Sequence, residues 1–521
     1  MKKKVFNKKN LYYVFLFVVV VFLSLVGLNS SPLNKGITQN DSAVFQIMGK
    51  GMIEGQVIYK DLFDHKGPIM YLINAIAYLI SPQIGLFIVE ILFIYIGAVF
   101  IFKTSKMFIN KEISLIMSLL YLMLIFVNEK ISFIMALFYL MLFFLYSWGG
   151  NFTEEYAMTF TSMALYCIMK IIYMNEYENK VLWVVIGATF ALNFFIKPTY
   201  IAVWIAFGII QFIYSVKEKK IKELLRYIFY MIIGILVVTI PIMIYLVLNN
   251  DINDFINAFF VMNMKYSKAG VLKKLKFFWI LINRYKYLNY IVIGFICNVL
   301  ILFSKKLDLK NKLFITIFFI ISIILTAWAP NAYKHYLIQL APSIIVELIV
   351  WCLCIKYSLK LNNKEKKILE ELPKKFLYII FVFFIVFSIS CNISNNFKIF
   401  SLAETNGKVT NEQLNELKKY LNEDDEIIVL GNQPYYYMYL NKQPKCKYFF
   451  QLPIILYDES IKEENKNYIM NNNPRIIIKY MKDYKEEDFN RIYGMDLDSY
   501  IKSTYDEYIS RDFKYYVLKE N

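Results

Sequence analysis

The sequence contains few charged residues for its length. Of its 521 residues, 19% are charged and 58% are hydrophobic, and the mean hydropathy is +0.45. A soluble domain is typically about 25% charged and about 45–50% apolar. This composition argues against a water-soluble enzyme, and it excludes a disordered chain, a collagen-like chain and a secreted disulfide scaffold.

Several motifs of soluble enzymes are also missing. Of the six cysteines, five lie in apolar stretches and none forms a CxxC pair, so neither a disulfide framework nor a zinc site is predicted. No P-loop and no GxGxxG after a strand supports nucleotide hydrolysis. Asp496-Leu497-Asp498 resembles the acidic triplet of soluble glycosyltransferases, but no nucleotide-binding βαβ unit surrounds it, so we interpret it as ordinary surface acids.

The net charge of +17 arises from 58 Lys+Arg against 41 Asp+Glu. In a soluble protein this excess would suggest nucleic acid as a partner. Here the basic residues gather in short connectors between apolar runs, which is how membrane topology is set. We therefore expect the lipid bilayer, and no nucleic acid, as a partner.

The N-terminus has a lysine-rich start and an apolar run, Leu11–Leu28. A signal peptide is the alternative, but no A-x-A-like cleavage site follows and the run is long enough to span a bilayer. The sequence thus predicts a first helix with a cytoplasmic N-terminus. Ten further apolar runs follow: Ile84–Phe102, Ile113–Trp148, Tyr156–Tyr173, Val181–Ile196, Tyr200–Val216, Tyr227–Leu248, Tyr287–Phe303, Leu313–Trp328, Tyr336–Ile355 and Phe376–Cys391.

Four basic connectors, at 103–111, 217–226, 305–312 and 364–375, satisfy the positive-inside rule if they are cytoplasmic. Segments 29–83, 149–155, 249–286 and 392–521 then lie outside. Two crossings within Ile113–Trp148 would reverse the later assignments, so we prefer one crossing with a re-entrant or interfacial helix. This gives about eleven spans in a cell-membrane protein.

Two outer segments are predicted to be ordered. In 29–83, Asp41–Glu54 and Ile69–Ile80 can form interfacial helices, the first stopped by Gly55 and the second opened by Pro68. The chain after Cys391 is polar, and its apolar pieces Glu426–Leu430, Arg475–Lys479 and Phe513–Leu518 suit short strands. The predicted fold is a polytopic α-helical membrane domain, 1–391, followed by a small extracytoplasmic α/β domain, 392–521.

Four ionisable residues stand out in the first outer segment: Asp41, Asp64, His65 and Lys66. A carboxylate at the membrane surface can take a proton from an acceptor hydroxyl, and a lysine can hold a phosphate. The alternative is an ordinary solvated loop, which the apolar flanks and Gly67-Pro68 disfavour.

The chain has only two histidines, His65 and His335, and each adjoins a lysine, Lys66 or Lys334. Both are predicted to face outward, where they could share a cavity and, with Asp64, bind a divalent metal ion. Two ligands do not make a site, so interfacial histidines without a role are the simpler interpretation, and the metal stays unknown.

Three other groups lie near predicted helix ends. Glu154 and Glu155 suit the first turn of a helix, which explains them without an active-site role. Lys197, before Pro198, must snorkel or face a cavity. Glu90 and Glu347 lie inside predicted spans, where we expect them to pair with neighbours.

Taken together and in their order, these pieces resemble the integral-membrane glycosyltransferases of the GT-C fold. The nearest branch is the bacterial dolichyl-phosphate-mannose-protein mannosyltransferase-like family, related to the lipid A aminoarabinose transferases. The matching pieces are Asp41-Ser42-Ala43-Val44-Phe45, Asp64-His65-Lys66-Gly67-Pro68, Gly150-Asn151-Phe152-Thr153-Glu154-Glu155-Tyr156, Lys197-Pro198, His335-Tyr336-Leu337 and Val429-Leu430-Gly431-Asn432-Gln433-Pro434.

The resemblance implies transfer of a sugar from a polyprenyl-phosphate donor to a hydroxyl of a cell-envelope lipid, glycan or protein. It makes Asp41 the catalytic base and Lys66 the donor-phosphate residue. His65, Lys334 and His335 are further phosphate candidates, although many relatives have Arg-Tyr-x-Leu-Pro where this chain has Lys334-His335-Tyr336-Leu337-Ile338. Asp64, Glu154, Glu155 and Lys197 are other candidate site residues, and the doubled acid leaves open which glutamate replaces the family's single Asp. The alternatives are a lipid or polysaccharide flippase, or a non-catalytic relative.

Overall fold

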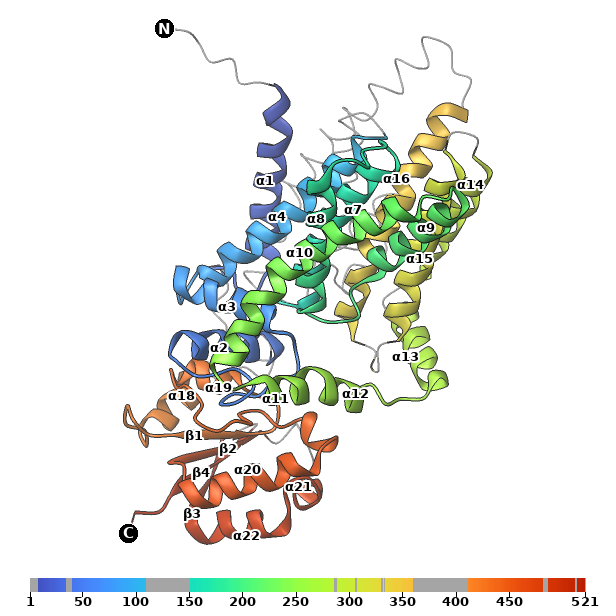
Figure 1. The fold of residues 1–521 in the computed structure, drawn as a ribbon. Coiled ribbons are helices and arrows are strands. Elements are labelled where there is room, and N and C mark those ends of the chain that lie inside the picture. The colour runs from blue at the N-terminus through green and yellow to red at the C-terminus, as the bar shows by residue number, and fades with distance from the viewer. Residues whose placement is uncertain are drawn as a thin grey trace. The chain divides into compact units, whose positions relative to one another are not determined.

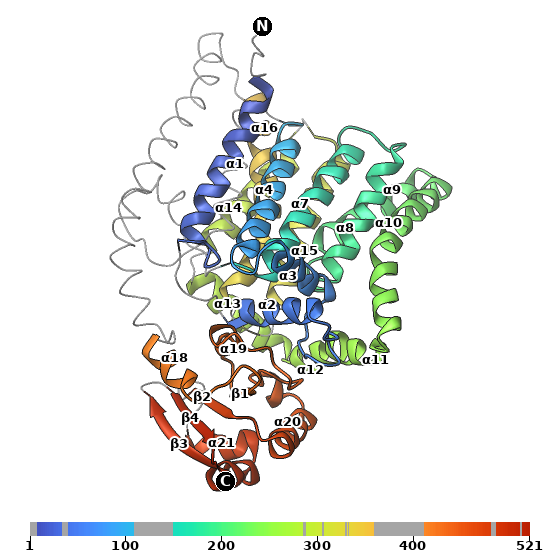
Figure 2. The ribbon, with the colours of Figure 1, turned by 90° about the vertical axis from the view of Figure 1, so that its left-hand side faces the viewer.

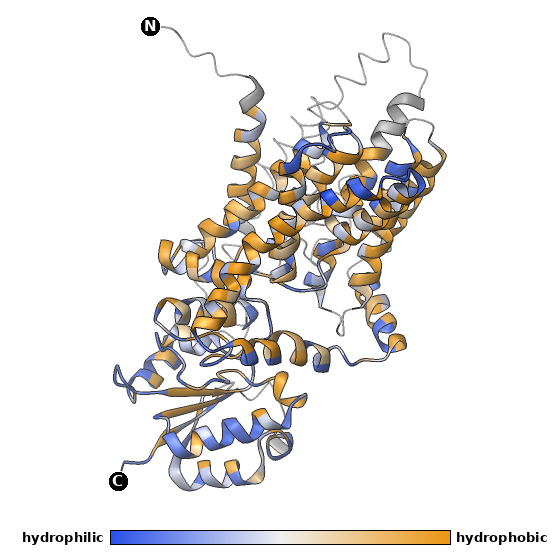
Figure 3. Cartoon of the chain, viewed as in Figure 1, coloured by the Kyte–Doolittle hydropathy of each residue, from blue (hydrophilic) through white to orange (hydrophobic). Residues whose placement is uncertain are grey.

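Apolar helices make up most of the computed structural model (Figures 1 and 3). It describes residues 8–33, 40–108, 150–284, 288–304, 307–328, 331, 333–358, 411–480, 486–510 and 513–520. The chain divides into two units. Unit 1 comprises Met1–Leu33, Phe87–Met243 and Ala269–Ile393, and unit 2 comprises Asn34–Leu86, Ile244–Lys268 and Ser394–Asn521.

Unit 1 consists mainly of helices in the part that the structure describes. Its elements are α1 (Lys8–Gly27), α4 (Gly85–Ser105), α7 (Thr153–Ile172), α8 (Lys180–Phe194), α9 (Ala202–Lys217), α10 (Ile221–Leu248), α13 (Val271–Arg284), α14 (Leu288–Phe303), α15 (Leu309–Ala327), η2 (Lys334–Leu340) and α16 (Ala341–Ser358). Three of these, α4, α10 and α15, are long and apolar enough to cross a membrane. The chain is therefore an integral membrane protein, whereas the side that each loop faces stays a prediction.

The apolar runs of the sequence match these helices. The runs before 113 and between 156 and 355 each coincide with a helix within a few residues, except that Tyr336–Ile355 begins in the 3₁₀ turn η2 before it continues as α16. Ile113–Trp148 and Phe376–Cys391 lie outside the described residues. The number of eleven spans therefore stays a prediction.

Two glycines allow α8 and α10 to cross at very short range. A Cβ on Gly187 would lie 1.9 Å from the carbonyl oxygen of Met231, and a Cβ on Gly234 would lie 2.0 Å from that of Val184. Close backbone approach at small residues is how helices pack in membranes, where burial of apolar surface gives little net gain. Beside the crossing, Trp183 stacks on Tyr227 with ring centroids 4.4 Å apart.

Unit 2 combines the segment that is predicted to lie outside, which we call the first outer segment, with the C-terminal chain. The outer segment forms α2 (Asn40–Ile53) and α3 (Pro68–Ile80), as predicted, and Gly55 follows α2 with a φ of 92°. The backbone N–H of Phe63 donates to the carbonyl of Lys447 at 2.9 Å, and the side-chain amide of Gln56 donates to that of Pro444 at 2.8 Å. Also in this unit are α11 (Ile252–Phe255), the π-helix η1 (Ile256–Met262) and α12 (Asn263–Tyr266).

A four-stranded mixed sheet forms the centre of the C-terminal part (Figure 2). The strand order is β1-β2-β4-β3, with β1 (Ile427–Leu430) parallel to β2 (Ile476–Tyr480) and β4 (Phe513–Leu518) antiparallel to both β2 and β3 (Tyr505–Ser510). The helices of this part are α18 (Asn411–Lys418), α19 (Tyr435–Tyr439), the 3₁₀ turn η3 (Ile454–Leu456), α20 (Glu459–Asn472), α21 (Glu486–Tyr493) and α22 (Met495–Thr504). A small α/β part was thus predicted correctly, but β3 was missed because it is a polar edge strand.

Candidate functional site

The predicted site residues fall into two groups, one in each unit. Unit 2 holds Asp41, Asp64, His65 and Lys66, and unit 1 holds Glu154, Glu155, Lys197, Lys334 and His335. We refer to Asp64, His65, Lys66 and Tyr71 as the Asp64–Lys66 cluster. We refer to Glu90, Glu154 and Glu155 as the carboxylate cluster.

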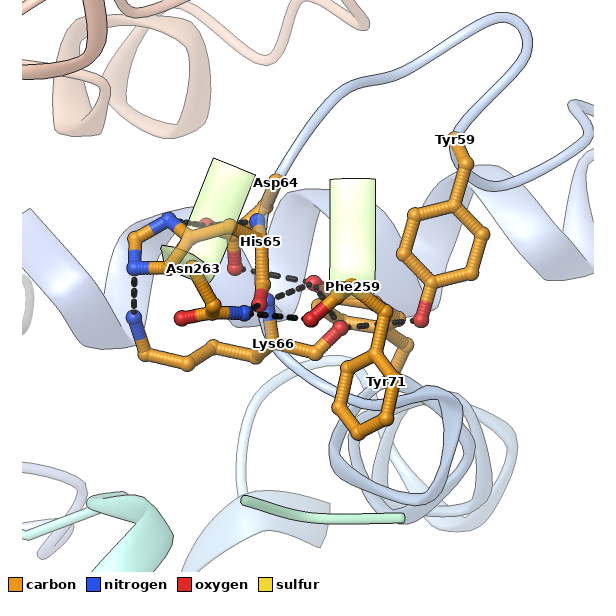
Figure 4. Close-up of polar contacts among 7 residues, drawn as sticks. All are labelled: Tyr59, Asp64, His65, Lys66, Tyr71, Phe259 and Asn263. Atoms are coloured by element: carbon orange, nitrogen blue, oxygen red, sulfur yellow. Dashed lines mark hydrogen bonds and ion pairs between the residues drawn. The ribbon is translucent and has the colours of Figure 1, made fainter. Parts of the chain in front are cut away.

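The Asp64–Lys66 cluster lies directly before α3 (Figure 4). Asp64 is buried, and its Oδ1 accepts from the backbone N–H of His65 at 2.7 Å. The hydroxyl of Tyr71, from the first turns of α3, donates to Oδ2 at 2.9 Å. Pro68 at the first helical position fixes where α3 begins, and thereby places Tyr71 under the turn.

His65 bridges the acid and the lysine. Its Nδ1 lies 3.2 Å from Oδ1 of Asp64, and its Nε2 lies 2.6 Å from Nζ of Lys66. A neutral imidazole fits this geometry, with Nδ1–H directed at the carboxylate and Nε2 accepting from the ammonium. An ammonium has three N–H donors, and His65 accepts only one of them. The other two N–H groups of Lys66 can bind an anion.

The backbone of the same turn is also held in place. The carbonyl of Lys66 accepts from the hydroxyl of Tyr59 at 2.9 Å, and the side chain of Asn263 donates to the carbonyl of His65 at 2.6 Å (Figure 4). Asn263 begins α12 and lies far along the chain, so sequence reasoning had no signal for it. The cluster is therefore fixed before any ligand arrives.

Electrostatics keep Asp64 ionised. Burial favours the neutral acid, but the charge of Lys66 and the hydrogen bonds from His65 outweigh burial and lower the pKa of Asp64 to about 2. An acid with so low a pKa is a poor proton acceptor. Asp64 therefore orients His65 and Lys66 and is not suited to act as a base.

Asp41 differs from Asp64 in each of these respects. It lies in the first turn of α2, where the helix dipole favours a negative charge. It is exposed and makes no hydrogen bond or ion pair with the residues that the structure describes. Its oxygens are therefore available to a hydroxyl group from solution.

The carboxylate cluster brings three acids together at the start of α7. Glu90, from α4, accepts hydrogen bonds from the hydroxyl of Ser30 and from the backbone N–H of Asn151. Glu155 accepts from the backbone N–H of Phe152 at 3.4 Å. Burial and the charge of Glu90 raise the pKa of Glu155, which precedes the predicted span Tyr156–Tyr173.

Glu154 is the ionised member of the cluster. Its carboxylate accepts from the hydroxyl of Tyr200 and lies 3.6 Å from Nζ of Lys197. Although burial opposes it, the charges of His335 and Lys197 lower the pKa of Glu154 to about 2. The ammonium of Lys197 also lies 4.3 Å from the ring centroid of Tyr336. Lys197, which was predicted to snorkel or to face a cavity, therefore contacts a buried carboxylate as well as aromatic rings.

His335 lies in η2, which packs on α7 and α15. Its ring stacks on Phe152 at 4.7 Å and on Tyr333 at 5.7 Å between centroids. Lys334 begins η2, but its side chain lies outside what the structure describes. Whether His335 and His65 share a cavity stays a prediction.

Among the described residues, no three His, Cys, Asp or Glu side chains form a group that could hold a metal ion. The shared divalent site that the two histidines suggested therefore gains no support within these residues. Asp496 and Asp498 lie in the first turn of α22, and Asp498 pairs with Lys502 at 2.6 Å. They are surface acids, as interpreted from the sequence.

Comparison with known families gives a match over most of the chain. Residues 1–401 match the family described as "Putative competence-induced protein Ccs4 N-terminal domain". The chain belongs to this family. No curated protein sequence matches the chain.

Solved structures show the same fold over the whole chain. ArnT from Cupriavidus metallidurans, bound to undecaprenyl phosphate, is 11% identical with a TM-score of 0.57, and the match covers 97% of each chain. Its apo state is 12% identical, with the same TM-score and coverage. The apo oligosaccharyltransferase of Archaeoglobus fulgidus is 10% identical with a TM-score of 0.50, and the match covers 99% of this chain and 75% of the oligosaccharyltransferase. At such identities the likeness shows the fold alone, which is the GT-C-like fold that the sequence predicted.

Proposed function

We propose that this protein transfers a sugar from a polyprenyl-phosphate donor to a hydroxyl of a cell-envelope lipid, glycan or protein at the outer face of the cytoplasmic membrane. The observation that carries the proposal is the fixed Asp64–Lys66 cluster in the outer segment of a GT-C-like fold. Further support comes from ArnT, whose solved structure contains undecaprenyl phosphate.

In the proposed reaction, Lys66 binds the phosphate of the donor. Asp64 and His65 direct its ammonium, and the hydrogen bonds to the neighbouring backbone keep this direction without cost at the moment of reaction. By the family resemblance, Lys334 and His335 are candidates for additional phosphate contacts. The lipid tail would occupy apolar surface among the helices.

Asp41 is the proposed base. It accepts the proton of the acceptor hydroxyl while the oxygen forms a bond to the anomeric carbon. The bond between that carbon and the phosphate oxygen breaks, and polyprenyl phosphate leaves with the bonding electrons. A single displacement of this kind inverts the anomeric carbon and needs no nucleotide.

We expect Asp41→Asn to lower the rate of sugar transfer by at least about 100-fold, because the amide cannot take the proton. The measurement is transfer from a synthetic polyprenyl-phosphate sugar by the purified protein in detergent. Glu54→Gln, an exposed acid just past the other end of α2, is the matched control and should retain activity. Full activity of Asp41→Asn would remove the proposed base.

We expect Lys66→Ala to raise the KM for the donor about 10–100-fold, since a hydrogen bond to a charged group is lost. The KM for the acceptor should change much less. Lys60→Ala removes an exposed lysine from the same loop and serves as the control. An unchanged donor dependence in Lys66→Ala would contradict the phosphate role.

The same assay separates a transferase from a flippase. A transferase forms a covalent product in detergent, where the two sides of a membrane no longer exist. A flippase moves its lipid without bond formation, so it would give no product under any donor concentration.

A further inference from the structure

Helix α13 presents an apolar face that no described part of unit 1 covers. Leu272 is 84% exposed and Trp279 is 59% exposed, and Val271 and Leu275 are exposed beside them. Residues at spacings of three, four and seven share one side of a helix, so these four side chains form a single stripe. We refer to it as the α13 stripe.

The opposite side of α13 is anchored to the protein. Leu281 is buried, and α13 packs on α15. Lys274 is also buried, and its ammonium lies 4.2 Å from the ring centroid of Trp328 at the end of α15. The orientation of the helix is thereby fixed within unit 1, and the α13 stripe faces away from α15.

Lysines border the α13 stripe. Lys273 and Lys276 are exposed on the flank of the helix. The chain around them contains no acid at all between Asp254 and Asp308. Over the same interval the basic residues are Lys265, Lys268, Lys273, Lys274, Lys276, Arg284, Lys286, Lys305 and Lys306.

These features distinguish between the occupants that the α13 stripe could have. The buried centre of a protein interface is depleted in charge and lysine is rare there, whereas apolar residues flanked by lysines are typical of a helix that lies in the headgroup layer of a bilayer. Tryptophan favours the same layer. Uncharged lipid would leave the lysines without counter-charge, whereas anionic headgroups complement them.

We infer that α13 lies in the membrane surface and binds anionic phospholipid, with the α13 stripe among the upper acyl carbons and Lys273 and Lys276 at the phosphates. The inference is independent of the proposed sugar transfer. It assigns a lipid-binding surface to the segment 249–286, which the sequence had placed only in an outer loop.

The depth of the stripe can be tested with Trp279. The full-length protein and its Trp279→Phe variant are placed in nanodiscs whose lipids carry bromine near the headgroup, and quenching of tryptophan fluorescence is compared. The chain has six tryptophans, so an average tryptophan would account for one sixth of the quenched fluorescence. We expect the loss of Trp279 to remove more than one sixth of it. Equal quenching in both proteins would mean that water, a second copy or another protein covers the stripe, and would overturn the inference.

The charge preference is tested by titrating phosphatidylglycerol into phosphatidylcholine micelles and following Tm. We expect phosphatidylglycerol to raise the Tm of the parent protein. In the variant K273E/K276E, the phosphatidylglycerol concentration that gives half of this rise should increase about fivefold for each lysine reversed. The control K418E/K419E reverses two exposed lysines at the end of α18 and should behave like the parent. If K273E/K276E does not fold, K273Q/K276Q takes its place. An unchanged response to phosphatidylglycerol overturns the inference.

Discussion

At the residue scale, environment separates acids that the sequence presents as equivalent. Asp41 and Asp64 lie in one outer segment, yet one is exposed and the other is buried beneath Lys66 and His65. A sequence shows which residues are acidic but not how much water reaches them, so both had to be kept as candidates. Glu90 was expected only to pair with neighbours inside its predicted span, and it accepts a hydrogen bond from the backbone of Asn151, 61 residues along the chain.

A third acid, Asp251, shows the opposite behaviour to Asp64. It is fully buried after α10, and neither oxygen finds a hydrogen-bond donor among the described residues. Burial, together with the charge of Asp254, raises the pKa of Asp251 to about 7. The folded protein therefore prefers its protonated form.

This shift predicts a pH dependence of stability. The unfolded chain releases the proton of Asp251 near pH 4, and the folded chain holds it to about pH 7, so stability falls as pH rises through this window and is level above it. We expect Asp251→Asn to remove this contribution and to raise Tm at pH 8 relative to the parent, because the folded variant no longer has to bury a charged carboxylate. Thermal unfolding of the parent and of Asp251→Asn in detergent at several pH values measures the pH dependence and the difference in Tm. Parallel curves for the two proteins would contradict the buried neutral acid.

At the element scale, the helices of unit 1 were largely predictable because a bilayer span needs a long apolar run, which any sequence displays directly. The helices α2 and α3 were found from Gly55 after the first and Pro68 at the start of the second, whereas their place in the membrane interface stays a prediction. The strand β3 was not found, since its exposed residues Asp506, Glu507 and Ile509 give no apolar alternation. Its position depends on pairing with β4, which is a tertiary contact.

The crossing of α8 and α10 gives a prediction at this scale. Gly187→Leu and Gly234→Leu each insert a side chain where a carbonyl oxygen of the other helix already lies, so the helices must separate. We expect each variant to lose at least about 2 kcal/mol of stability, seen as a lower Tm. Gly208→Leu in α9 meets no atom within 4 Å and is the control. A Tm equal to that of the control would show that the crossing is looser than described.

At the scale of the whole molecule, the side of the membrane occupied by each loop is still a prediction from charge. Reporter fusions can measure it. A phosphatase joined after Asn521 should be active, and one inserted at Lys219 in the basic connector should be inactive. The reverse pattern would indicate two crossings within Ile113–Trp148, and it would place residues 392–521 on the cytoplasmic side. Residues 29–83 precede this run and would keep their assignment, so the hydrogen bond between Phe63 and Lys447 would contradict that topology.

The pairing of Gln56 with Pro444 joins residues 388 positions apart. At about 5–20 residues per second, a ribosome needs on the order of 20–80 seconds between the two. During that interval the nascent outer segment lacks the support that Phe63 later receives from Lys447. A later segment of the chain thus completes a unit that an earlier segment began, and a premature stop codon between the two would cost the protein far more than the polar part it deletes.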